Sequence, residues 1–286
     1  MSPMPEAPSP EAPPGAALFV LAHHDDEVFC AGHLRRALLE GKRVLLLWAT
    51  AGGLAPAGRR VLDGTRVARG LGLAPGRCRD LHLPDQGGLP HVEAIAAAAA
   101  ELLDAAQVAG APAPSVFVPA YEGGHPDHDA VNLAVAVLRS RRPGIGVREF
   151  PLYRRGGAGL SVQAPQPAAG TAPAPFEILE LGAGALALRR RLVGANASQA
   201  LPSLLPLLAL AWAQGAGRAE PSRALPAHDY ARPPHGGALL YELYTRRRFA
   251  EFRAAALAAL PGALAARPDT EEPGAASPLA SGHSGV

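Results

Sequence analysis

Residues 18–27 read LFVLAHHDDE, an apolar run that ends in five consecutive ionisable residues. A short apolar run bounded by a turn signal is typical of a buried strand in a parallel sheet. Ligands of open α/β folds bind outside the carboxyl ends of such strands. We therefore expect the polar residues from His23 to Glu27 to lie in an active site.

The rest of the N-terminal half alternates apolar runs with stretches of helical periodicity. Helices are expected at 28–39, 59–70 and 92–108 and after Asp129, which can cap the last of them and leave His125 and His128 in a loop. Further strands are expected at 43–49, 79–83, 115–120 and 147–153. This alternation predicts an α/β fold, a Rossmann-like doubly wound and mostly parallel sheet flanked by helices, with an elaborated C-terminal portion.

One domain is expected over residues 16–262, with a core at 16–153 and the elaboration at 154–262. In the elaboration we expect a loop at 154–175, a strand at 176–181, a helix opening at 186–192, a strand-like segment at 238–244 and a final helix at 248–260. The apolar segment at 201–212 is shorter than the roughly 20 residues that span a membrane, and it contains two prolines. A helical hairpin is expected there, and it is the candidate for any subunit contact.

Composition excludes several classes of function. Residues 1–15 are Pro/Ala/Glu-rich without a basic start or an apolar stretch, so they do not resemble a signal peptide; like residues 263–286, they are expected to be disordered. The balance of 27 Lys and Arg against 25 Asp and Glu has no basic block typical of a nucleic-acid surface. Two cysteines make no disulfide framework, which favours a reducing cytoplasm. Composition therefore gives no sign of a nucleic-acid partner.

A second polar cluster follows the apolar run at 115–120, where residues 121–129 read YEGGHPDHD. Parallel strands place their carboxyl ends at one sheet edge, so the two clusters are expected to meet. A hydrolytic metal ion needs three ligands, commonly two His and one carboxylate, and an open position for water. The residues that supply this set are His23, Asp26 and His128.

The neighbouring polar residues suit the remaining steps of hydrolysis. Asp25, next to a ligand but aimed differently, can take a proton from a water that the metal makes more acidic. His125 can stabilise an oxyanion or protonate a leaving amine, and Asp127 can orient a neighbouring histidine.

The sequence AHHDDE at 22–27 resembles the Ala-His-Pro-Asp-Asp-Glu signature of the PIG-L / LmbE-like de-N-acetylases, and HPDH at 125–128 is similar to their second motif. Weaker similarities are RVLD at 60–63 before a Leu-Gly turn, LPD at 83–85 and Ser198-Gln199. The resemblance covers residues 17–150 well and the remainder loosely. His24 stands where the family usually has Pro, and Asp63 where it usually has Glu.

The resemblance implies a zinc-dependent enzyme that removes acetyl from N-acetylglucosamine-type sugars in glycolipids, thiol cofactors or antibiotics. It implies zinc on His23, Asp26 and His128, with Asp25 as general base and His125 as the electrostatic or acid residue. Substrate contacts are expected from Thr50, Arg60 and Asp85, against the alternative that these three serve only loop or helix structure.

Other interpretations of the same residues remain open at this point. A lone Asp-Asp-Glu after a strand is often a helix N-terminal charge cluster, and His-Pro-Asp-His can be a capping loop. His24 is either a tolerated replacement or a contact to substrate or to the ligands' surroundings. Two His and one carboxylate also suit Fe(II) for oxygen chemistry, and a degenerate member would bind a sugar conjugate without turnover. A zinc hydrolase acting on an N-acetylated amino-sugar conjugate is the hypothesis that uses both clusters.

Overall fold

The computed structural model describes residues 13–53, 55–157, 159–165 and 175–260. The predictions of disorder at 1–15 and 263–286 fall outside these ranges, apart from residues 13–15.

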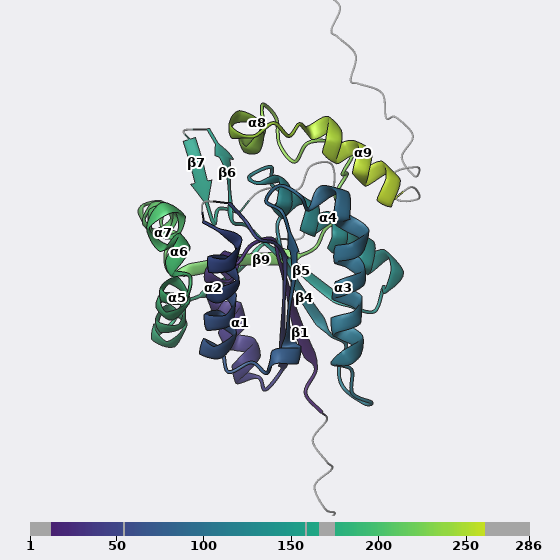
Figure 1. Ribbon diagram of the computed structural model, residues 1–286, viewed down its shortest axis with the longest axis vertical. Coiled ribbons are helices and arrows are strands. Elements are labelled where there is room, and N and C mark those ends of the chain that lie inside the picture. The colour runs from purple at the N-terminus through teal and green to yellow at the C-terminus, as the bar shows by residue number, and fades with distance from the viewer. Residues whose placement is uncertain (1–12, 54, 158, 166–174, 261–286) are drawn as a thin grey trace, which may run out of the picture.

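A seven-stranded sheet runs through the centre of the molecule, in the order β3-β2-β1-β4-β5-β9-β8 (Figure 1). Its strands are β1 (Ala16–Leu21), β2 (Arg43–Thr50), β3 (Cys78–Leu83), β4 (Ser115–Pro119), β5 (Gly146–Phe150), β8 (Glu177–Glu180) and β9 (Ala219–Ala224). The pairings among β1 to β5 are parallel, whereas β9 pairs antiparallel with both β5 and β8. The predicted mostly parallel α/β sheet is therefore confirmed, with an antiparallel edge.

Helices cover both faces of this sheet (Figure 1). On one face lie α3 (Val92–Ala105), α4 (Pro126–Arg141) and α9 (Phe249–Ala259), and on the other lie α1 (Ala31–Leu39), α2 (Ala57–Gly70), α5 (Ala183–Ala195) and α7 (Leu205–Ala213). Short turns of 3₁₀ helix occur at η1 (Asp26–Cys30), η2 (Pro75–Arg77) and η3 (Leu89–His91).

The central strand β1 is buried along its whole length, with Leu18 opposite Leu45 of β2 and Val116 of β4. Leu18 and Val20 join the apolar core beneath α3 and α4, while Phe19 and Leu21 join the core beneath α1 and α2. A strand covered on both faces must be apolar throughout, which explains why its sequence shows no alternation.

Two expectations for the C-terminal portion are wrong, and one strand was not predicted. Residues 238–244 form helix α8 (Leu240–Tyr244) rather than a strand. The expected loop at 154–175 contains a two-stranded hairpin, β6 (Tyr153–Gly156) with β7 (Gly159–Val162), while residues 166–174 of it lie outside the described ranges. Strand β9 was not predicted, because its sequence AEPSRA lacks the apolar residues that identify a strand. Its pairing with β5 on one side and β8 on the other, and the buried partners of Glu220 and Arg223, stabilise it instead.

Residues 201–212 are helical, as predicted, but the expected hairpin is also wrong, because they belong to one continuous helix over Ala197–Ala213. This helix consists of α6 (Ala197–Gln199), one π turn, η4 (Ala200–Leu204), and α7. It packs loosely, since Leu201 is 78% and Trp212 57% exposed. No single helix among the described residues is long and apolar enough to cross a membrane; one pair, Ala183–Ala195 with Ala197–Ala213, passes by length and composition but is bent by 81°.

The buried imidazole of His33 on α1 makes the free energy of unfolding depend on pH. Its ring packs on Phe117, its Nδ1 lies 3.4 Å from the Arg36 guanidinium, and its Nε2 has no hydrogen-bond partner among the described residues. Burial, with the positive charges of Arg36 and Arg148, lowers the pKa of His33 to about 3, although the neighbouring Glu220 opposes this.

Because the folded-state pKa lies below the unfolded value of about 6.5, this contribution to stability is complete above pH 6.5 and decreases as the pH falls towards 3. We expect His33→Gln to remove up to about 1.4 kcal/mol per pH unit from the acid dependence of the unfolding free energy. Urea unfolding of both proteins between pH 7 and 5 measures this, and identical pH slopes would contradict it.

Candidate metal and catalytic site

Four loops that follow parallel strands meet at the carboxyl edge of the sheet. They follow β1 at 22–25, β2 at 51–53, β3 at 84–88 and β4 at 120–125. All of the candidate site residues lie on these loops or on the first residues beyond them, except Arg60 on α2 and Thr50, the last residue of β2. The expected meeting of the two polar clusters is therefore observed.

Asp26 lies at the centre of the first cluster. Its Oδ2 accepts hydrogen bonds from the backbone N–H groups of Ala22 (2.8 Å) and His23 (3.0 Å), which fixes the carboxylate. Its Oδ1 is left facing two imidazoles, with His128 Nε2 at 3.3 Å and His23 Nδ1 at 3.8 Å. One ligand atom from each of His23, Asp26 and His128 lies within 4.8 Å of the others, and all three side chains are buried.

The electrostatics of this group favour a cation. Burial opposes protonation of His23, but hydrogen bonds to Asp127 and Asp26 outweigh it and raise the pKa of His23 to about 10. Burial also opposes ionisation of Asp26, yet His128 and His23 lower its pKa well below the usual value. Neither ring nitrogen of His128 has a well-directed hydrogen bond within the described residues. Buried nitrogen donors that surround an ionised oxygen in this way fit a divalent metal ion.

The expected start of the helix that follows the second polar cluster is wrong. Helix α4 begins at Pro126 with His125 as its N-cap, so His128 and Asp129 lie in its first turn rather than in a loop and a cap. Proline suits the first helical position, where no hydrogen bond from its nitrogen is needed. His125 Nδ1 accepts the Asp127 N–H at 3.2 Å, and Asp129 Oδ1 accepts the N–H groups of Glu122 and Gly123.

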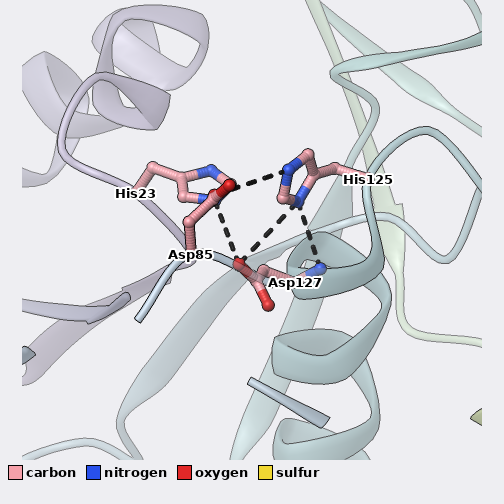
Figure 2. Close-up of side chains that lie close together, drawn as sticks. All are labelled: His23, Asp85, His125 and Asp127. Atoms are coloured by element: carbon pink, nitrogen blue, oxygen red, sulfur yellow. Dashed lines mark hydrogen bonds and ion pairs between the residues drawn. The ribbon is translucent and has the colours of Figure 1, made fainter. Parts of the chain in front are cut away.

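His125 holds one defined tautomer when it is neutral. Because its Nδ1 accepts a backbone N–H, the proton must be on Nε2, which faces the site 3.8 Å from Asp85 Oδ1 (Figure 2). Burial and the neighbouring His23 and His128 lower the pKa of His125 well below its usual value. The imidazole therefore presents a neutral N–H donor to the site.

Asp127 connects the loops. Its Oδ2 lies 3.3 Å from His23 Nε2 (Figure 2). The same atom accepts hydrogen bonds from the Gln86 N–H (2.8 Å) and the Thr50 hydroxyl (3.2 Å), while Oδ1 accepts the Gly88 N–H (2.8 Å). Burial opposes ionisation, but His23, His125 and these donors lower the pKa of Asp127 to about 2.

A second group of possible metal ligands overlaps the first. Its members, His23, Asp85, His125 and Asp127, also place one ligand atom each within 4.8 Å (Figure 2). However, the Asp127 carboxylate already accepts three hydrogen bonds besides its contact with His23. The Asp26 Oδ1 atom is not engaged by backbone donors, so the His23, Asp26 and His128 group is the better ligand set.

Asp25 lies beside this group with a charged partner. Its carboxylate is paired with Arg60, whose guanidinium nitrogens lie 3.2 and 3.4 Å from its two oxygens, and Arg60 Nε donates to the Ala51 carbonyl. Burial raises the pKa of Asp25 to about 6, although Arg60 opposes the shift.

The three residues expected to contact substrate differ in whether their polar atoms are bonded within the protein or exposed. The polar atoms of Thr50 and Arg60 bind within the protein, to Ala22, Ala51, Asp25 and Asp127. Asp85 is 31% exposed at the side chain and faces His23 and His125. Substrate contact by these residues stays a prediction.

Sequence patterns did not identify two aromatic residues at the site. The Tyr153 ring packs edge-on against His128 at 5.3 Å, and Tyr244 lies 6.3 Å from His125 and donates its hydroxyl to the Gly124 carbonyl. A Cβ on Gly124 would lie 1.8 Å from the Tyr153 carbonyl oxygen, so this approach requires glycine. Only the Gly-Gly pair at 123–124 signalled a close contact, and it did not indicate the partner.

The remaining motif residues form hydrogen bonds that connect the site loops to neighbouring segments. Glu27 accepts hydrogen bonds from the Asp25 N–H, Trp48 Nε1 and Asn196 Nδ2. Asp63 accepts the backbone N–H and the hydroxyl of Ser198, which joins two motif residues that lie far apart in the sequence.

Comparisons with known proteins agree with this fold. A comparison with curated proteins found no match. Among solved structures, a deacetylase from the teicoplanin biosynthesis pathway, in its complex with bog, aligns with a TM-score of 0.54 at 17% identity over 73% of this chain and 96% of that one. The zinc-inhibited form of teicoplanin deacetylase aligns with a TM-score of 0.53 at 16% identity over 73% and 97%. At these low sequence identities, the two structural alignments show a shared fold.

The family model described as PIG-L, GlcNAc-PI de-N-acetylase, matches residues 18–138, which include both polar clusters. Residues 18–138 of this chain are therefore similar to a PIG-L family domain.

Proposed function

We propose that this protein is a metal-dependent hydrolase that removes the N-acetyl group from an N-acetylglucosamine-type amino-sugar conjugate. The observation that carries the proposal is the Asp26 carboxylate, whose Oδ1 faces His23 and His128 while backbone donors hold Oδ2. The family description and the deacetylases of similar fold support the reaction class.

The metal ion would be held by His23, Asp26 and His128, a ligand set that suits Zn²⁺ best and also accepts Fe²⁺. When bound, a divalent ion supplies Lewis acidity, which polarises a carbonyl and makes water more acidic. Asp127 contacts Nε2 of His23, on the opposite side of the ring from Asp26, so it holds this imidazole in the ligating orientation.

Asp25 is the proposed general base. It takes a proton from the attacking water while the new C–O bond forms at the acetyl carbonyl, and its pairing with Arg60 aims the carboxylate. His125 donates its Nε2–H to the developing oxyanion, since Nδ1 is occupied by a backbone N–H. The C–N bond then breaks and the proton held by Asp25 passes to the leaving nitrogen, giving acetate and a free amino sugar.

The structure also suggests where the conjugate would lie. Asp85, with its partly exposed carboxylate, and Tyr244, which is 53% exposed, flank His125. Both lie on segments outside the buried ligand set, so we propose that they contact the sugar or its substituent.

The two overlapping ligand groups make different predictions for the Zn²⁺ affinity of His128→Ala and His125→Ala. We expect His128→Ala to reduce Zn²⁺ affinity by more than the roughly 10–100-fold that loss of an outer partner costs, because it removes a ligand. His125→Ala should retain affinity, and Asp127→Asn should fall within that 10–100-fold range because it only orients His23. Calorimetric Zn²⁺ titration and metal analysis measure all three, and loss of binding in His125→Ala alone would reverse the assignment.

The catalytic proposal is tested with Asp25→Asn. We expect its kcat for amine release from a panel of N-acetylglucosaminyl conjugates to fall by about 10²–10⁴, the usual contribution of a general base, with bound zinc retained. The matched control is Asp104→Asn on α3, which removes an exposed carboxylate that pairs with Arg142 after α4. Full activity in Asp25→Asn would refute the mechanism, and no amine release by the zinc-loaded wild type would refute the proposed reaction.

A further inference from the structure

His24 is the residue of the 22–27 motif that differs from the family signature, which has proline there. Its side chain is 1% exposed, although it is neither a candidate ligand nor a candidate catalytic group. A buried imidazole inside an active-site loop needs partners to offset the loss of water.

Three elements contact the ring, although its Nδ1 has no hydrogen-bond partner among the described residues. His24 Nε2 lies 2.8 Å from Asp80 Oδ2 on β3. The imidazole ring packs on Trp48 of β2, with centroids 4.8 Å apart and an angle of 33° between the planes. On α2, a Cβ at Gly64 would lie 2.5 Å from His24 Cδ2, so only glycine leaves room for the ring.

The next residue, Asp25, has an unfavourable backbone conformation. Its φ of 128° and ψ of −21° lie in a region that residues with a side chain rarely adopt. Such a conformation persists only where the surroundings over-determine it. On its C-terminal side, Glu27 accepts the Asp25 N–H and the Asp25 carbonyl accepts the Val28 N–H. On its N-terminal side, the contacts of the His24 ring with Asp80 and Trp48 restrict the backbone that leads into Asp25.

We propose that His24, held by Asp80, Trp48 and the space at Gly64, is a positioning residue that maintains the backbone of Asp25. In the family signature the ring of proline restricts φ at this position, and here a buried side-chain contact supplies the restriction instead. The His24 N–H forms no hydrogen bond with any residue in the described ranges, so proline at this position would remove no bond. The inference rests on the proposed role of Asp25 as general base.

The test is a double-mutant cycle, because the proposal makes the effects of Asp80 and Gly64 depend on residue 24. In the wild-type background, we expect Asp80→Ala and Gly64→Ala each to lower kcat by about 10–100-fold, the order of loss that a misplaced catalytic group causes. The KM and the bound zinc should stay unchanged. In a His24→Pro background the same two substitutions should change kcat less than twofold.

The matched control is Gly58→Ala, because Gly58 lies on the same helix and an added Cβ there would meet no atom within 4 Å. It should leave kcat unchanged in both backgrounds. A fall in kcat of the same size with histidine or proline at position 24, or no fall in either background, would overturn the proposal.

A second measurement does not depend on the reaction. In the metal-free protein, Asp80→Ala and His24→Ala should increase hydrogen exchange in a peptide covering residues 22–28, and Asp80→Ala should not do so in the His24→Pro background. Equal exchange in wild type and Asp80→Ala would also overturn the proposal. If the wild type released no amine from any conjugate, the proposed function would fail while the exchange measurement still decided the role of His24.

Discussion

The arrangement of the site depends on the carboxylate of Asp127. It lies on the first turn of α4, after β4, and contacts His23 after β1, Thr50 at the end of β2, and Gln86 and Gly88 after β3. One buried anion thereby joins the ends of four parallel strands. Removing it would take an acceptor from the Gln86 and Gly88 N–H groups and from the Thr50 hydroxyl, and leaving such donors unpaired is more costly than losing the bonds alone.

The other buried carboxylates follow the same physical principle. Asp26, Glu122 and Asp129 each accept two backbone N–H groups from the loops at the sheet edge. Burial still raises the pKa of Glu122 to about 8 and that of Asp129 to about 7, because backbone donors offset only part of the cost of removing a carboxylate from water. Around His23 the acidic groups are instead balanced by imidazoles, and this concentrates charge where a metal ion would bind.

Much of the parallel core was predictable, since strands buried on both faces are continuous apolar runs and their helices have clear periodicity. The boundaries of β1, β2, β3 and β4 agree with the predicted strands to within two residues. The C-terminal portion was less predictable because its elements depend on partners. Strand β9 contains two buried charged residues, Glu220 and Arg223, which are neutralised by Arg189 and Glu149. Helix α8 has an apolar sequence that suits a strand equally well.

The sequence by itself determined the fold class, the two polar clusters and their meeting, because parallel strands bring their carboxyl ends to one edge whatever lies between them in the chain. Only the tertiary structure decided how each side chain is used: that Asp26 offers one free oxygen, that His125 presents Nε2–H, that Arg60 pairs with Asp25, and that His24 occupies the space left by Gly64. Residue types and spacing define which groups can meet, whereas the direction of each donor and acceptor depends on contacts among segments that are distant in sequence.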